Sequence, residues 1–68
     1  MSTYKITFRW KDTKGIWRDD TYYNVNTTAW RVVEQFKAWL GDSEATGYII
    51  DGIYVDTIYG WESREVEW

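Results

Sequence analysis

One segment of the chain, residues 27–41, has a sustained helical repeat, whereas the sequence on either side of it reads as strand and turn. Its apolar side chains fall on one stripe at about 100° per residue. They are Ala29, Val32, Val33, Phe36, Trp39 and Leu40. Asn26, Thr27 and Thr28 offer side-chain oxygens to the unpaired N–H groups at the start of the helix, and Gly41 suits a left-handed exit. Because so short a helix is marginal alone, the sequence predicts that it lies on a sheet.

The chain is short and lacks the disulfides and structural metal sites that usually stabilise short chains. It has 68 residues, with no cysteine for a disulfide and no histidine. A disulfide or a Cys/His metal site therefore cannot stabilise it. Six Trp, six Tyr and two Phe supply apolar surface instead, since each such side chain can bury about 150–250 Å². We expect a single domain, residues 1–68, with a core rich in aromatic rings.

The segment before the helix predicts a β-hairpin. Residues 3–11 alternate between apolar and polar without interruption, which is typical of a strand with one buried face. The side chains on its apolar face are Tyr4, Ile6, Phe8 and Trp10. A turn over residues 12–15, with Gly15 left-handed, returns the chain as a second strand over residues 16–25.

Two registers compete in this hairpin. A four-residue loop at 12–15 places Arg9 opposite Arg18 on the outer face. A three-residue loop pairs Arg9 with Asp19 instead, and it turns Arg18 and Asp20 onto the apolar face. An unpaired buried charge costs several kcal/mol, whereas an exposed ion pair contributes only about 0–1 kcal/mol. The sequence therefore favours the four-residue loop.

The chain after the helix predicts a second hairpin and a further strand. Asp51-Gly52 lies between apolar residues and is a strong signal for a two-residue turn. We therefore expect residues 47–50 to pair with residues 53–58. Residues 61–68 alternate less clearly, so they are predicted to form an edge strand or a partly frayed tail.

The predicted order is β-β-α-β-β, with residues 61–68 as a fifth strand where they pair. A single helix between two hairpins can bury its stripe only across one face of their joint sheet. We therefore predict an α+β, two-layer domain with one helix across a four- or five-stranded mixed sheet. A late strand parallel to the first would make this sheet β-grasp-like.

Three sequence stretches, TYKITF, KDTKG and VVEQFKAW, follow one another between residues 3 and 40. Their layout resembles the small immunoglobulin-binding domains of bacterial surface proteins. The resemblance implies a fold analogy alone, because the sequence after Gly41 departs from those domains.

Charge is distributed unevenly along the chain, whose net charge is −3. Residues 1–24 carry five basic and three acidic side chains, whereas residues 41–68 carry seven acidic and one basic. In the favoured register the basic side chains of the first hairpin surround Tyr22 on the outer face. Two interpretations fit this pattern. The charges favour an ordinary solvated face that is charged to discourage edge pairing, and the alternative is a contact face for an acidic or phosphate-bearing partner.

The sequence offers little for catalysis. Without histidine and cysteine, it lacks the commonest general base, the thiolate nucleophile and the usual transition-metal ligands. No Gly-x-Ser-x-Gly turn or Gly-rich phosphate loop occurs. Asp42 with Glu44, and Glu65 with Glu67, could hold a hard cation but lack a ligand-rich loop. We expect no enzymatic activity, no catalytic residue, no cofactor and no metal.

The sequence predicts a soluble cytoplasmic protein that does not bind membranes. Its N-terminus lacks the uninterrupted apolar run of a signal peptide. No segment approaches the roughly 20 apolar residues of a membrane span.

Aromatic residues exceed what one helix and one sheet face can cover, and Trp, Tyr and Arg are the types that anchor protein interfaces. The residues assigned to a contact surface are Lys5, Arg9, Lys11, Arg18, Tyr22, Trp17, Trp61 and Trp68. We predict a small non-enzymatic interaction module that binds a protein partner or a second copy of itself. Domains of this size often come from phages or plasmids, where they serve as accessory or inhibitor proteins.

Two alternatives remain open from the sequence. The first is a nucleic-acid-binding domain that uses the basic outer face of the first hairpin for phosphates and its aromatic rings for stacking. The second is an acidic mimic of nucleic acid, in which Glu62, Glu65 and Glu67 stand in for phosphates.

Overall fold

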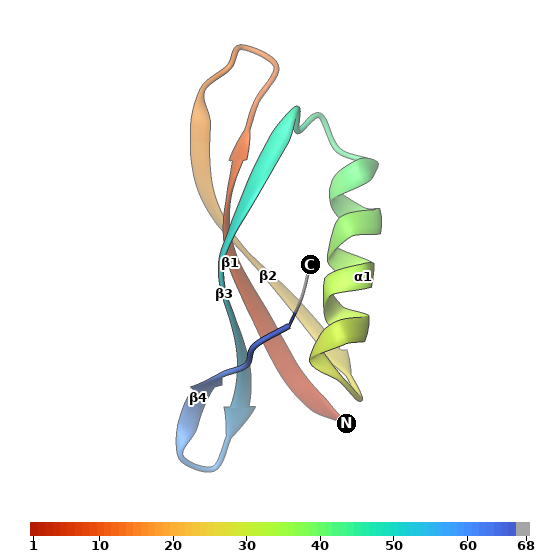
Figure 1. Cartoon of the computed structure of the whole chain (residues 1–68), viewed down its shortest axis with the longest axis vertical. Coiled ribbons are helices and arrows are strands. Elements are labelled where there is room, and N and C mark those ends of the chain that lie inside the picture. Colours follow the sequence, from red (N-terminus) through yellow and green to blue (C-terminus); the bar gives the residue numbers. More distant parts are fainter. Residues whose placement is uncertain (67–68) are drawn as a thin grey trace.

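The computed structural model describes residues 1–66, which form one helix lying on a four-stranded sheet (Figure 1). The elements are β1 (Ser2–Lys11), β2 (Trp17–Asn26), α1 (Ala29–Gly41), β3 (Gly47–Thr57) and β4 (Gly60–Ser63). The helix covers one face of the sheet and leaves the other uncovered in the described part of the chain. This arrangement confirms the predicted α+β, two-layer fold. The helix in the described range is too short and too polar to cross a membrane.

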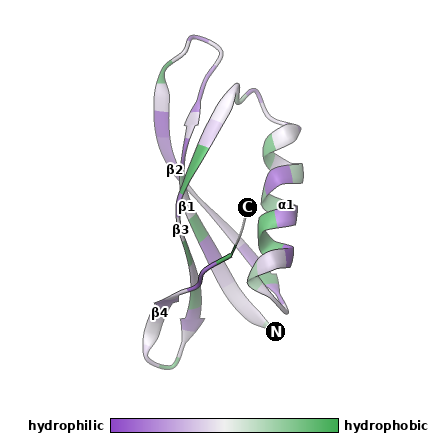
Figure 2. Cartoon of the chain, in the orientation of Figure 1, coloured by the Kyte–Doolittle hydropathy of each residue, from purple (hydrophilic) through white to green (hydrophobic). Residues whose placement is uncertain are grey.

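Helix α1 begins one residue after Thr28, whose side-chain oxygen accepts a hydrogen bond from the N–H of Arg31. Its hydrophobic positions face the sheet (Figure 2), and the buried ones are Val32, Val33, Phe36 and Leu40. The predicted stripe is thus confirmed, although Trp39 at its margin stays 47% exposed. The predicted left-handed exit at Gly41 is wrong, because only Gly15 and Gly60 have positive φ in the described range. The hydroxyl of Ser43 instead donates a hydrogen bond to a carbonyl of the last turn.

The first hairpin has the three-residue loop, so the predicted four-residue loop is wrong. Arg9 lies opposite Asp19, and Arg18 and Asp20 turn toward the side of the sheet that carries the helix. The burial penalty that disfavoured this register does not arise, because both side chains stay exposed. Figure 1 shows the reason, since the tip of the hairpin extends past the end of the helix.

Asp12 organises the turn of this hairpin. Its carboxylate accepts hydrogen bonds from the backbone N–H groups of Lys14 and Ile16, at 2.9 and 3.0 Å, and pairs with Arg18 at 2.9 Å. Gly15 has a φ of 80°, which confirms its predicted left-handed conformation. The backbone bond from Ile16 and the contact with Arg18 favour the ionised carboxylate and lower the pKa of Asp12.

The sheet is antiparallel throughout, with strand order β2-β1-β3-β4. The predicted mixed, β-grasp-like sheet is therefore corrected, because no strand in the described range pairs in parallel with β1. Helix α1 starts where β2 ends and runs back along the sheet, so the next strand starts at the far end (Figure 1). β3 then fills the position beside β1 in the opposite direction.

Asp51 and Gly52 form a β-bulge within β3, and the predicted hairpin turn at this position is wrong. Thr7 lies opposite Gly52 and Phe8 lies opposite Ile50, which leaves Asp51 as the extra residue. Gly52 does not have the positive φ that a tight hairpin turn requires. β3 is therefore one strand of 11 residues that pairs along most of β1.

The second hairpin joins β3 to β4 instead, through a turn that ends at Gly60, whose φ is 101°. β4 is a short edge strand, so the predicted edge strand over residues 61–68 is confirmed only as far as Ser63. Residues 64–66 are not in a strand. The rest of the predicted segment, residues 67–68, lies outside the described residues.

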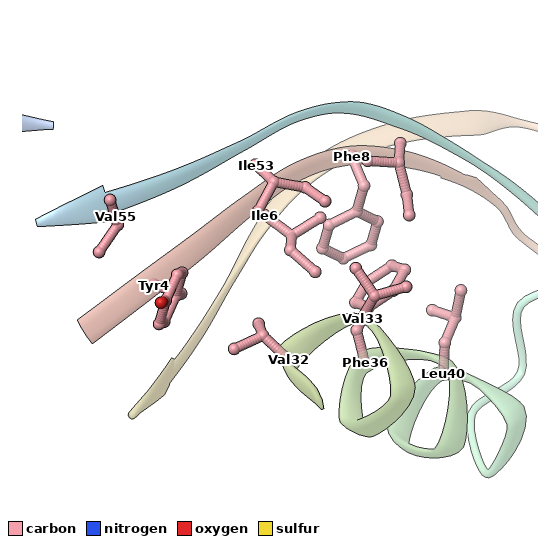
Figure 3. Close-up of a cluster of buried hydrophobic side chains, with 10 residues drawn as sticks. Tyr4, Ile6, Phe8, Val32, Val33, Phe36, Leu40, Ile53 and Val55 are labelled. Carbon is pink, nitrogen blue, oxygen red and sulfur yellow. The ribbon is translucent and has the colours of Figure 1, made fainter. Parts of the chain in front are cut away.

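The core fills the space between α1 and the sheet (Figure 3). At its centre, the rings of Phe8 and Phe36 meet edge to face with centroids 4.7 Å apart. The ten buried hydrophobic residues are Tyr4, Ile6, Phe8, Val32, Val33, Phe36, Leu40, Ile50, Ile53 and Val55. The first three are among the four residues that the alternation of the first strand assigns to the inner face. The fourth, Trp10, is partly buried against the same core, so the predicted inner face is confirmed.

We expect Phe36→Ala to lower the free energy of unfolding by about 3–5 kcal/mol, because it removes a fully buried ring and leaves a cavity. Urea unfolding followed by circular dichroism measures this loss. Trp30→Ala is the control, since Trp30 lies on the same helix but is 59% exposed, and its cost should stay within about 0.5 kcal/mol. Equal losses in the two variants would contradict the proposed core.

The lowered pKa of Asp12 makes its contribution to stability dependent on pH. Because the folded pKa lies below the unfolded value of about 4, the contribution is present above that pH and disappears as pH falls through the folded pKa. Asp12→Asn should therefore be less stable than the wild type at pH 7, with a difference that shrinks under acid. Thermal unfolding between pH 7 and pH 2 measures this trend, and a difference that does not shrink would contradict it.

Candidate interaction surface on the uncovered sheet face

The face of the sheet opposite α1, here called the open face, carries the odd-numbered side chains of β1 and β2. Side-chain alternation and strand register place Ile49 and Tyr54 of β3 and Trp61 of β4 on the same face. Its large exposed apolar side chains are Trp17, Tyr23, Val25, Ile49 and Trp61, with exposed fractions between 41% and 61%. Large exposed apolar side chains on one face are a feature of interaction sites in soluble proteins.

Lys5 organises one end of the open face. Its ammonium nitrogen lies 4.4 Å from the ring centroid of Trp61 and 5.4 Å from that of Tyr54. The ring of Trp61 is also 6.3 Å from that of Tyr23. These four residues, called the Lys5 cluster, come one from each strand of the sheet. Cation–π contacts of about 0.5–1 kcal/mol each favour this arrangement of the rings in the free protein.

An ion pair crosses the middle of the open face. The guanidinium of Arg9 contacts both carboxylate oxygens of Asp51, with Nη2 3.0 Å from Oδ1 and Nε 3.2 Å from Oδ2. The hydrogen bond and the charge of Asp51 raise the pKa of Arg9. Asp19 faces Arg9 from the other side. The positive charge of Arg9 is thus balanced within the protein.

Five of the eight predicted contact residues lie together on the open face. They are Lys5, Arg9, Lys11, Trp17 and Trp61. The predicted placement of Arg18 and Tyr22 on this face is wrong, because a shift of one residue in register moves every side chain of β2 to the other face. Arg18 pairs with Asp12. Tyr22 packs against Phe36, with 5.5 Å between the centroids of the two rings. Trp68 and Glu67 lie outside the described residues.

Sequence reasoning missed Tyr23 and Val25 for the same reason, since the favoured register assigned them to the inner face. The signal that could have found them is the complementary pair Arg9 and Asp19, which lie opposite each other only with the shorter loop. The sequence predicts a turn at Asp51, whereas its pairing with Arg9 depends on the bulge.

Acidic residues do not converge on a metal site within residues 1–66, where no group of three or more carboxylates is close enough to hold an ion. Glu62 instead pairs with Arg64 at 3.5 Å. The open face therefore offers apolar contact, hydrogen bonding and balanced charge.

No protein-family model matches this chain, and searches of curated proteins and of solved structures likewise find no match.

The ring of Tyr54 lies across Gly52 and leaves no space for a side chain at position 52. A Cβ atom at position 52 would be 2.6 Å from the Tyr54 hydroxyl oxygen. We expect Gly52→Ala to displace this ring from Lys5 and to cost about 1–3 kcal/mol of unfolding free energy. Gly52→Ala in a Tyr54→Ala background should cost less unfolding free energy. Urea unfolding of the wild type, the two single variants and the double variant measures the difference.

Gly41→Ala is the matched control, because a Cβ there meets no atom within 4 Å. Its position in a helix predicts no loss, and a gain of up to about 1 kcal/mol. Equal costs for Gly52→Ala with and without the Tyr54 ring would contradict the steric explanation.

Proposed function

We propose that this domain is a non-enzymatic interaction module that binds another protein through the open face of its sheet. The observation that carries the proposal is the exposure of five large apolar side chains on a face that no described element covers. In an antiparallel sheet with one face exposed to water, the side chains on that exposed face are usually polar. The composition of this face, with Trp, Tyr and Arg, is the one that anchors protein interfaces.

The rigidity of the open face supports the same proposal. Lys5 lies between the rings of Trp61 and Tyr54, and Arg9 is held by two contacts to Asp51. Side chains that are already ordered lose little conformational entropy when a partner docks. The partner expected from this surface has an apolar patch to cover the rings, with hydrogen-bond acceptors or carboxylates near Lys5 and Lys11.

The charge arrangement favours a protein partner over nucleic acid. Binding to phosphates requires cations whose counterions can be released, but Arg9 is paired with Asp51 and Arg18 with Asp12. Asp19 adds a further negative charge to the open face. The acidic-mimic alternative gains no support either, because Glu62 is paired with Arg64 and Glu67 lies outside the described residues.

The proposal is tested by placing a photo-crosslinking amino acid at Tyr23 on the open face, and separately at Trp30 on the helix, in the source cells. We expect a defined protein to be captured from position 23 and not from position 30. With that protein purified, calorimetry should show that Tyr23→Ala and Trp61→Ala each weaken binding by at least about tenfold. Trp30→Ala should bind like the wild type.

Two outcomes would overturn this proposal. If the captured protein is a second copy of the chain, and sedimentation shows a dimer that Trp61→Ala dissociates, the open face is a self-association surface. If a captured partner binds Tyr23→Ala and Trp61→Ala as tightly as the wild type, its binding site lies elsewhere.

A further inference from the structure

A pocket of about 240 Å³ opens on the helix side of the sheet, where the C-terminal end of α1 faces the first hairpin. It lies on the opposite side of the sheet from the open face. The residues that line it are Phe8, Trp10, Asp20, Trp39, Leu40, Ser43 and Glu44. Sites for drug-sized ligands usually measure about 300–1,000 Å³, so this pocket suits something smaller, such as one long side chain.

Three aromatic side chains line the pocket, namely Phe8, Trp10 and Trp39. Trp39 is 47% exposed, yet its ring is held on several sides by other rings. Its centroid lies 5.1 Å from that of Tyr22 and 6.1 Å from that of Phe8, which meets it edge to face. Trp10 adds a second indole, partly buried against the core. A flat ligand group could therefore stack on a ring surface that does not need to rearrange.

Two carboxylates line the same pocket, and neither forms an ion pair within residues 1–66. Asp20 accepts a hydrogen bond only from the neighbouring N–H of Thr21, and Glu44 has no side-chain hydrogen bond in that range. Arg18 is the nearest cation on the same face of β2, but its guanidinium is bound by Asp12 at 2.9 Å. The pocket thus combines aromatic rings with negative charge that the described part of the protein leaves unneutralised.

We propose that this pocket binds an arginine side chain presented by a partner protein. A guanidinium is planar and weakly hydrated, so it can stack on Trp39 while it donates hydrogen bonds to Asp20 or Glu44. The stem of the side chain would cover the apolar wall formed by Phe8 and Leu40. A lysine ammonium is compact and strongly hydrated, and it would gain less from the flat ring. This site does not depend on the open face.

The test is a titration of the intact protein with the peptide acetyl-Gly-Arg-Gly-amide. Binding is followed by the NMR chemical shifts of the backbone amide and indole N–H groups and by Trp fluorescence. We expect saturable binding with a millimolar dissociation constant and the largest shifts at the indoles of Trp39 and Trp10. The same peptide with citrulline in place of arginine keeps the shape without the charge, and it should bind at least about tenfold more weakly. Equal binding of the two peptides would overturn the proposal.

Asp20→Asn should weaken binding of the arginine peptide by at least about fivefold, because it removes one of the two carboxylates of the pocket. Asp20 is exposed, so the change should leave the fold intact. Asp19→Asn is the matched control, since this neighbouring carboxylate points to the open face. It should leave peptide binding unchanged. Equal losses in both variants would show a general effect of net charge and would contradict a site in the pocket.

Trp39→Leu should abolish saturation, with Trp30→Leu as the control on the exposed side of the same helix. A titration with methylguanidinium alone distinguishes a free small cation from the arginine side chain of a partner protein. If it binds as tightly as the arginine peptide, the pocket is a site for a free small cation, and the proposed protein partner is wrong. Unchanged binding of the captured open-face partner to Asp20→Asn would confirm that the two sites are independent.

Discussion

The contact between Phe36 of the helix and Phe8 of the central strand is the interaction on which the rest of this structure depends. It lies at the centre of the core, and its position determines which face of the sheet is buried. One helix of 13 residues covers one face of a four-stranded sheet. The other face must meet water or a partner, whatever its composition. The partner that we propose for the open face is argued from this layer arrangement together with the exposed apolar residues on that face.

Local periodicity was sufficient to predict the helix, the inner face of the first strand and the two-layer fold, because burial follows period in long amphipathic segments. It was insufficient for the register of the first hairpin. Burial of Arg18 and Asp20 would be costly only if the helix covered the hairpin as far as its tip. The hairpin extends past the helix, so these side chains stay exposed, and the Asp12 contacts at the turn stabilise the shorter loop. The length of overlap between two elements is a tertiary property that strand alternation does not carry.

The bulge at Asp51 shows a second limit of local signals. Asp-Gly between apolar residues favours a tight turn, but here both residues serve contacts with distant parts of the chain. Arg9 binds the Asp51 carboxylate across 42 positions of sequence, and β1 offers a long partner along which β3 can pair without a break. Because a continuous β3 occupies the position beside β1, no place remains there for the late parallel strand of a β-grasp sheet. The continuous β3 thus replaces both the predicted turn at Asp51 and the predicted parallel strand.

The two candidate sites share a single strand and the same geometric cause. Asp19 and Asp20 are neighbours in β2, but alternation sends Asp19 toward Arg9 on the open face and Asp20 into the aromatic pocket. With the longer loop their roles would be exchanged, because a register shift of one residue inverts both faces of a strand. The Asp12 turn selects the register, so it also determines which carboxylate neutralises the open face and which one stays available in the pocket. A residue that touches neither site thereby specifies the charge of both.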